Sequence, residues 1–151
     1  MMVNSKDKGA GFERDLVKLL NDRLICGTFK RIPGSGAIGT IMKEGSLTAD
    51  VSGKIQGFNK KIKGECKVGY GGATQLTLKK EWIDKVIKQS SQDYSFPVLF
   101  GKFSGARKSD GVQMFVVMDI DNFIDLMNYM TKLAEGEVNG DILGGTEETS
   151  D

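Results

Sequence analysis

The residues of this sequence that could do chemistry are Glu65, Cys66 and Lys67, together with Asp50 on the segment before them. Side chains alternate between the two faces of a strand, so Glu65 and Lys67 would share one face and Cys66 would point to the other. A second carboxylate on that face would complete a site able to bind a divalent cation and hydrolyse a phosphodiester. An acid-x-lysine triplet alone more often consists of exposed residues without a catalytic role. A catalytic role therefore depends on whether Asp50 lies beside it.

Two segments of alternating polarity, residues 47–55 and 61–68, predict the strands that carry these residues. The residues between them, 56–60, have the composition of a turn. We therefore expect a β-hairpin with one buried face and one polar face.

The register of this hairpin decides which residues meet. A turn centred between residues 57 and 58 places Asp50 opposite Glu65, with their Cβ atoms about 5 Å apart. Two carboxylates that close repel each other unless a cation lies between them. A slip of two residues would instead place Lys67 or Lys63 opposite Asp50, and this alternative stays open.

A third carboxylate, Glu13, lies on the first expected helix, residues 8–24. Phe12 and Leu16 belong to the apolar stripe of that helix, and Glu13 lies beside them. An acid at this position either flanks the buried stripe or points towards the active face of the sheet. We expect Glu13 to join Asp50 and Glu65 as a metal ligand.

Composition limits the chemistry that is available. The 151 residues suggest one domain, and the absence of histidine excludes His-based zinc sites and Ser-His-Asp triads. Two cysteines do not make a disulfide framework, and with no apolar run of transmembrane length we expect a cytoplasmic protein. Residues 1–110 have a charge balance of +9 and residues 111–151 one of −8. The basic part, which carries the candidate site, suits a polyanionic partner, although a solvated lysine-rich surface would look the same.

The remaining pattern predicts an α/β fold with a small mixed sheet flanked by helices. Residues 27–46 contain five of the 20 glycines and read as loop. Residues 1–134 are expected to form one nuclease domain, and the acidic segment 135–151 a disordered tail. We expect a second helix over residues 78–89 with Leu78, Trp82 and Val86 inward, followed by strands over 97–103 and 112–118. A last helix, capped by Asp119 or Asp121, would end near Leu133. Its expected inward residues are Phe123, Leu126, Met127 and Met130.

The order of these motifs resembles a known family. It begins with Lys8-Gly9-Ala10-Gly11-Phe12-Glu13-Arg14 and continues through Arg31, Gly34-Ser35-Gly36 and Asp50 to Gly64-Glu65-Cys66-Lys67. This series resembles the archaeal-type Holliday junction resolvases of the PD-(D/E)XK nuclease superfamily over residues 8 to about 103. The resemblance implies a restriction-endonuclease-like core of αβββαβ order, here followed by an extra C-terminal helix.

The resemblance also implies a function. It implies a homodimer that cuts four-way DNA junctions with Mg²⁺, for which Mn²⁺ could substitute. Glu13, Asp50, Glu65 and the backbone carbonyl of Cys66 would hold the metal, and Lys67 would be the catalytic lysine. Thr48-Ala49-Asp50 departs from the superfamily pattern, which has proline before the first acid. The resemblance and the basic charge together predict DNA contacts from Lys8, Arg14, Lys30, Arg31, Ser35, Lys79 and Lys80.

Two alternatives stay open. One is another PD-(D/E)XK nuclease, of phage or mobile-element origin, that acts on duplex or flap DNA. The other is a DNA-binding module that keeps the fold without cutting. The presence of all four candidate residues, Glu13, Asp50, Glu65 and Lys67, argues against loss of catalysis.

Overall fold

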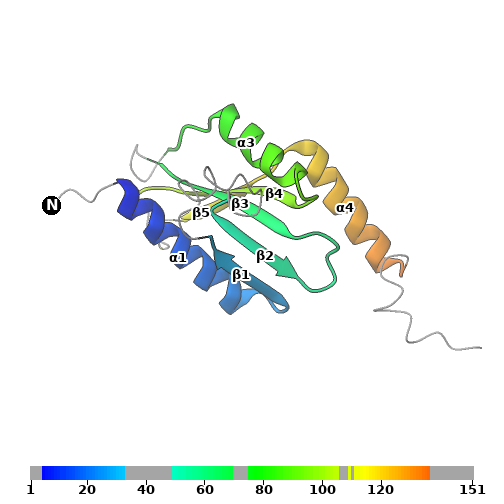
Figure 1. Cartoon of the computed structure of the whole chain (residues 1–151). Helices are drawn as coiled ribbons and strands as arrows, with labels where there is room; N and C mark the ends of the chain where they lie inside the picture. Colours follow the sequence, from blue (N-terminus) through cyan, green and yellow to red (C-terminus); the bar gives the residue numbers. More distant parts are fainter. Residues whose placement is uncertain (1–4, 33–48, 70–74, 106–108, 110, 137–151) are drawn as a thin grey trace, which may run out of the picture. The chain divides into compact units, whose positions relative to one another are not determined.

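The computed structural model describes residues 5–32, 49–69, 75–105, 109 and 111–136. The chain divides into two compact units, residues 1–118 and 119–151. Among the described residues, the first unit contains a sheet with two helices, and the second contains one helix. Along the chain the elements are α1 (Ser5–Arg23), β1 (Gly27–Arg31), β2 (Val51–Ile55), β3 (Ile62–Val68), α3 (Lys80–Ser91), β4 (Phe96–Lys102), β5 (Met114–Val117) and α4 (Ile120–Ala134) (Figure 1).

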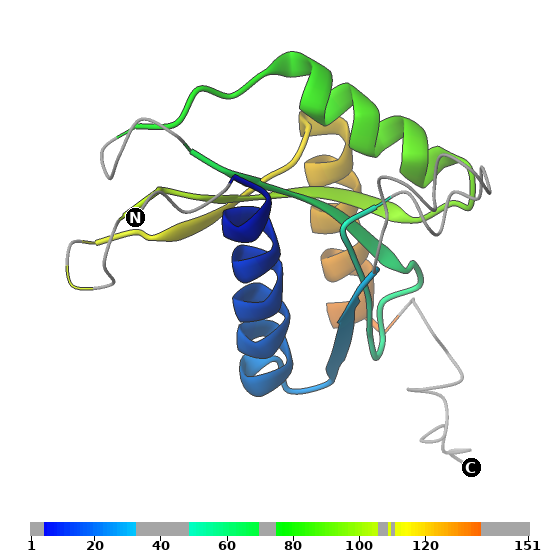
Figure 2. The same cartoon turned by 60° about the vertical axis from the view of Figure 1, so that its left-hand side comes forward.

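A five-stranded mixed sheet in the order β1-β2-β3-β4-β5 forms the centre of the first unit. Strands β3 and β4 are parallel, and the other neighbouring pairs are antiparallel. Helix α3 connects the parallel pair, as such pairs require a crossover. Helices α1 and α3 lie on opposite faces of the sheet (Figure 2). This arrangement confirms the expected α/β class and restriction-endonuclease-like core.

Strand β1 corrects the prediction that its residues form a loop. It pairs with β2, and its Phe29 ring lies over Gly53, where a Cβ atom would come within 2.3 Å of the ring. Asn21 of α1 holds the same strand, donating to the Phe29 carbonyl at 3.0 Å and accepting from the Phe29 amide at 2.7 Å. The glycine-rich composition of 27–46 concealed a short edge strand whose stability comes from these tertiary contacts. The rest of the expected loop, residues 33–46, lies outside the described residues.

The expected register of the β2–β3 hairpin is confirmed, because Val51 pairs with Gly64 and Ser52 with Lys63. The second face is polar, as expected, but it is buried as well. Ser52, Lys63 and Glu65 are all buried, and α3 and the turn after it cover the Lys63 and Glu65 side chains. Alternation along the strands revealed the two faces but not the helix that covers the polar one.

The ammonium of Lys63 is a charge that lies buried beneath the turn after α3. Its side chain is only 1% exposed, and its ammonium lies 2.7 Å from Oδ2 of Asp93 in the turn after α3. Burial alone would raise the pKa of Asp93, but bonds with Lys63 and Ser95 hold it below its usual range. The ion pair therefore fastens the turn after α3 to the start of β3.

Replacing Asp93 with asparagine should destabilise the protein by about 2 kcal/mol, because it leaves the Lys63 ammonium buried without a counter-charge. The loss is smaller than for a fully buried pair because residue 93 is partly exposed to water. Because the folded-state pKa of Asp93 is lowered, this stabilisation is present at neutral pH and is lost as the pH falls below about 4. Urea unfolding at neutral and acidic pH measures both effects. Asp84→Asn, at an exposed surface pair with Lys80, is the matched control; an equal loss in both variants would contradict this role.

The other helices and strands fall close to their expected positions. Strand β4 is buried on both faces, as its apolar run predicted, and Val86 of α3 is buried. Leu78 was expected to point inward, but it precedes the first turn of α3 and is exposed. No described helix is both long and apolar enough to cross a membrane.

Helix α4 forms the described part of the second unit. Asp119 caps it, accepting a hydrogen bond from the Asn122 amide at 3.3 Å, which decides between the two expected caps. The expected inward side chains are not in a core: none of the residues of α4 is fully buried, and Phe123, Met127 and Met130 are exposed. The amphipathic pattern is present, but the second unit contributes no other described element to cover it. The expected tail from residue 137 onward lies outside the described residues.

Candidate active site

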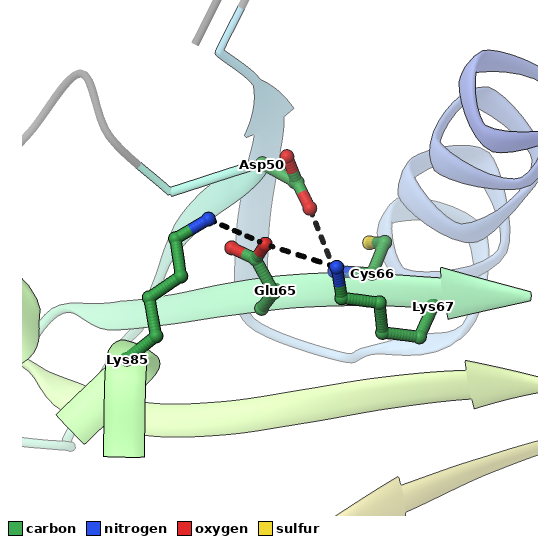
Figure 3. Close-up of polar contacts among 5 residues, drawn as sticks. All are labelled: Asp50, Glu65, Cys66, Lys67 and Lys85. Carbon is green, nitrogen blue, oxygen red and sulfur yellow. Dashed lines mark hydrogen bonds and ion pairs between the residues drawn. The ribbon is translucent and has the colours of Figure 1, made fainter. Parts of the chain in front are cut away.

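The predicted acids meet where the β2–β3 pairing ends. Asp50 directly precedes β2, and its amide donates to the Gly64 carbonyl at 3.1 Å, while its own carbonyl accepts from the Ile32 amide at 2.9 Å. The Asp50 carboxylate accepts a hydrogen bond from the Cys66 amide at 2.8 Å. Strand β3 continues past this point, so it presents Glu65 and Lys67 beside Asp50 (Figure 3).

Glu65 is a buried carboxylate with one satisfied oxygen and one unsatisfied oxygen. Its Oε1 lies 3.1 Å from the Lys85 ammonium and 3.7 Å from the Lys67 ammonium. Its Oε2 is buried and has no hydrogen-bond partner among the described residues. Burial, and then the charge of Asp50, raise the pKa of Glu65 above its usual value, and the two lysines only partly oppose this. A buried acceptor left without a partner is costly, so this oxygen is poised for a proton or a cation.

Glu13 approaches the same region from α1. Both Nε and Nη2 of Arg31 lie 3.1 Å from its Oε2. Burial and the charge of Asp50 nevertheless raise the pKa of Glu13, and Glu65 adds a smaller contribution. Glu13, Asp50 and Glu65 are therefore within range of one another's charge. Arg31, expected to contact DNA or support the site, supports it by holding Glu13.

These acids fit a hard divalent cation in type. Carboxylate oxygens are the ligands that Mg²⁺ prefers, and burial, followed by the charge of Asp50, raises the pKa values of Glu13 and Glu65. Within the described parts of the chain, no three side chains of His, Cys, Asp or Glu already converge around one point as metal ligands do. The unpartnered Oε2 of Glu65 is the observation that supports a cation here.

Cys66 takes part through its backbone. Its amide holds Asp50, and its thiol has a pKa raised well above the usual value by burial and by the neighbouring acids, Asp50 first. A thiol that stays protonated is a poor metal ligand. This agrees with the expectation that only the carbonyl of Cys66 would reach a metal, which stays a prediction.

Lys67 lies between Glu65 and an aromatic ring. Its ammonium is 5.0 Å from the centroid of the Trp82 ring, and that of Lys79 is 5.7 Å from the same centroid. Both distances allow a cation–π interaction. Trp82 was expected in the core, but it is only partly buried and instead holds Lys67 at the site.

The comparison with protein families agrees with this geometry. A family model described as "Phage putative PDDEXK endonuclease" matches residues 4–142. The chain belongs to this family. A search of curated proteins finds no match. The match supports the expected PD-(D/E)XK superfamily and a nuclease of that type. It does not support the narrower resemblance to the archaeal-type resolvases.

The remaining predicted DNA contacts are dispersed. Lys8, Arg14 and Lys30 are exposed. Lys8 also lines an open cavity of about 260 Å³ with Lys102, beside the end of β3. Lys79 lies at Trp82, and Lys80 pairs with Asp84 at 2.6 Å. Ser35 lies outside the described residues.

Lys85 is a further residue of the candidate site, through its ion pair with Glu65, that the sequence did not predict. A signal was present, since Lys85 follows Trp82 by three residues and precedes Gln89 by four, which places all three on one side of α3. Because the sequence did not show that this helix covers the polar strand face, a lysine on that side had no expected partner. The burial of Glu65 under α3 supplies one.

Proposed function

We propose that this chain is a divalent-metal-dependent DNA endonuclease whose site consists of Glu13, Asp50, Glu65 and Lys67. The observation that carries the proposal is the buried Glu65 carboxylate. One of its oxygens has no hydrogen-bond partner among the described residues, Lys67 lies against the other, and Asp50 lies directly before the neighbouring strand. Membership of a PDDEXK endonuclease family supports the reaction class.

The acids would hold the cation and the lysine would act on the phosphate. Asp50, Glu65 and the Cys66 carbonyl would be ligands, with Glu13 as a third carboxylate. Mg²⁺, or Mn²⁺ in its place, would supply an activated water and neutralise charge on the phosphoryl oxygens. Lys67 would orient the water or stabilise the developing negative charge. Trp82 restricts where that ammonium can lie.

The motif order and the family match favour different DNA structures as the substrate. The motif order resembles resolvases of four-way junctions, which would need a homodimer to cut paired strands. The phage family favours the alternative, a nuclease that acts on duplex or flap DNA. Cleavage of four-way junction, flap, Y-form and linear duplex, each with Mg²⁺ or EDTA, tests this. Absence of cutting on all four would reject the enzyme and favour the non-catalytic DNA-binding module.

DNA affinity should fall steeply with salt, because each lysine or arginine that contacts a phosphate releases counterions. We expect Lys30→Ala to reduce the slope of log K against log salt by about one. Lys18→Ala is the control, because Lys18 pairs with Asp22 on the same helix and is not an expected contact. Fluorescence anisotropy with labelled duplex measures the slopes. A salt-independent affinity for the wild type would exclude nucleic acid as the partner.

A further inference from the structure

Lys85 makes a contact that its own helix does not require. Glu81 lies four residues earlier on α3, the spacing at which glutamate and lysine form a favourable pair along a helix. The Lys85 ammonium instead lies 3.1 Å from Oε1 of Glu65 on β3 (Figure 3). It therefore supplies positive charge to the acid that the proposed function assigns to a metal.

The two partners differ in how freely they can move. The side chain of Glu65 is 4% exposed and that of Lys85 is 54% exposed, so the carboxylate is fixed while the ammonium can turn towards water. If Lys85 leaves, Glu65 keeps the Lys67 ammonium at 3.7 Å. Lys85 in turn has Glu81 within reach along its helix. Separation of this pair therefore leaves neither charge alone.

We propose that Lys85 is a displaceable counter-ion, which neutralises Glu65 in the metal-free protein and leaves when a divalent cation binds that carboxylate. This rests on the metal role assigned to Glu65 in the proposed function. The ammonium and the cation carry like charge, so they repel each other when both lie against one buried carboxylate. Lys85 therefore lowers the affinity of the site for metal. A residue that held the metal ligand in place would raise that affinity.

Calorimetric titration of the full chain with Mn²⁺ and with Mg²⁺, without DNA and at about pH 8 where free carboxylates are ionised, tests the competition. We expect Lys85→Met to bind either cation about tenfold more tightly than the wild type. Lys85→Arg keeps the charge and should bind as the wild type does. Lys88→Met is the matched control, because Lys88 is an exposed lysine on the same helix that contacts no acid among the described residues.

Thermal unfolding gives a second readout that needs no activity. In EDTA, Lys85→Met should unfold at a lower temperature than Lys88→Met, and added Mg²⁺ should raise its Tm by more. If Lys85→Met does not fold, Lys85→Gln removes the charge while keeping a hydrogen-bond donor and replaces it in both measurements.

The outcomes separate this inference from the proposed function. Equal metal affinity in the Lys85 and Lys88 variants would overturn the counter-ion role. Weaker binding by Lys85→Met would also overturn it, and would make Lys85 a support of the ligand. A wild-type protein that binds neither cation would overturn the proposed function itself.

Discussion

Glu65→Gln is expected to reduce metal-dependent DNA cleavage by about 10³-fold or more while the protein stays folded. Glutamine has nearly the same shape but lacks the charge that would hold a cation. It can still accept hydrogen bonds from Lys67 and Lys85 through its amide oxygen, so the packing under α3 should persist. The loss should therefore appear in turnover while the protein stays folded.

Cleavage of end-labelled DNA with Mg²⁺, beside anisotropy in EDTA, separates the two effects. DNA affinity should remain within about threefold of the wild type, because Glu65 is too buried to contact DNA directly. Glu81→Gln, at an exposed acid of α3, is the control and should cut normally. Wild-type turnover in Glu65→Gln would remove this residue from the site.

The same substitution has a pH signature in the metal-free protein. The folded-state pKa of Glu65 is raised, so its contribution to stability is greatest at acidic pH and is lost as the pH rises through that pKa. In EDTA, the wild type should therefore lose stability over this range, and Glu65→Gln should lose less. Thermal unfolding across pH, with Glu81→Gln as the reference, measures the difference.

Lys67→Met is expected to reduce the cleavage rate by about 10²-fold at saturating Mg²⁺ and DNA. Methionine can pack against Trp82 as the lysine stem does, so the change removes the ammonium and little else. Single-turnover measurements isolate the chemical step from DNA binding. The effect should fall on the rate, because the Lys67 ammonium lies 3.7 Å from Glu65, the proposed metal ligand.

Lys79→Met is the matched control for this lysine. Both ammoniums lie near the Trp82 ring, but Lys79 makes no ion pair with Glu65 among the contacts of the described residues. Its loss should weaken DNA binding and leave the saturated rate unchanged. Equal rates in the two variants would exclude Lys67 from the mechanism.

The sequence could predict the part of the site that lies on one hairpin. The alternation around Glu65 and the centre of the turn at residues 57 and 58 correctly gave the pairing of Val51 with Gly64, and so the place of Asp50. These features depend only on strand geometry and turn position. The α/β class followed from the same local patterns.

What could not be predicted depends on contacts between elements distant in sequence. The cover of α3 over Lys63 and Glu65 comes from the crossover between parallel strands, which no local pattern of residues 61–68 encodes. Strand β1 was missed because its pairing with β2 and its bonds to Asn21 outweigh a glycine-rich composition. Lys85 was missed because no local pattern showed that α3 covers Glu65.

The two bonds between Asn21 and the backbone of Phe29 have a consequence for how the site can be tuned from a distance. Glu13 lies eight residues before Asn21 on α1, about 12 Å along the helix, and Arg31 lies two residues beyond Phe29 on β1. Helix and strand are thus joined at Asn21 and again, towards their other ends, where Arg31 bonds to Glu13. A change at Asn21 would alter the alignment of those ends, so variation at this remote position could adjust the third acid while every residue of the site stays the same.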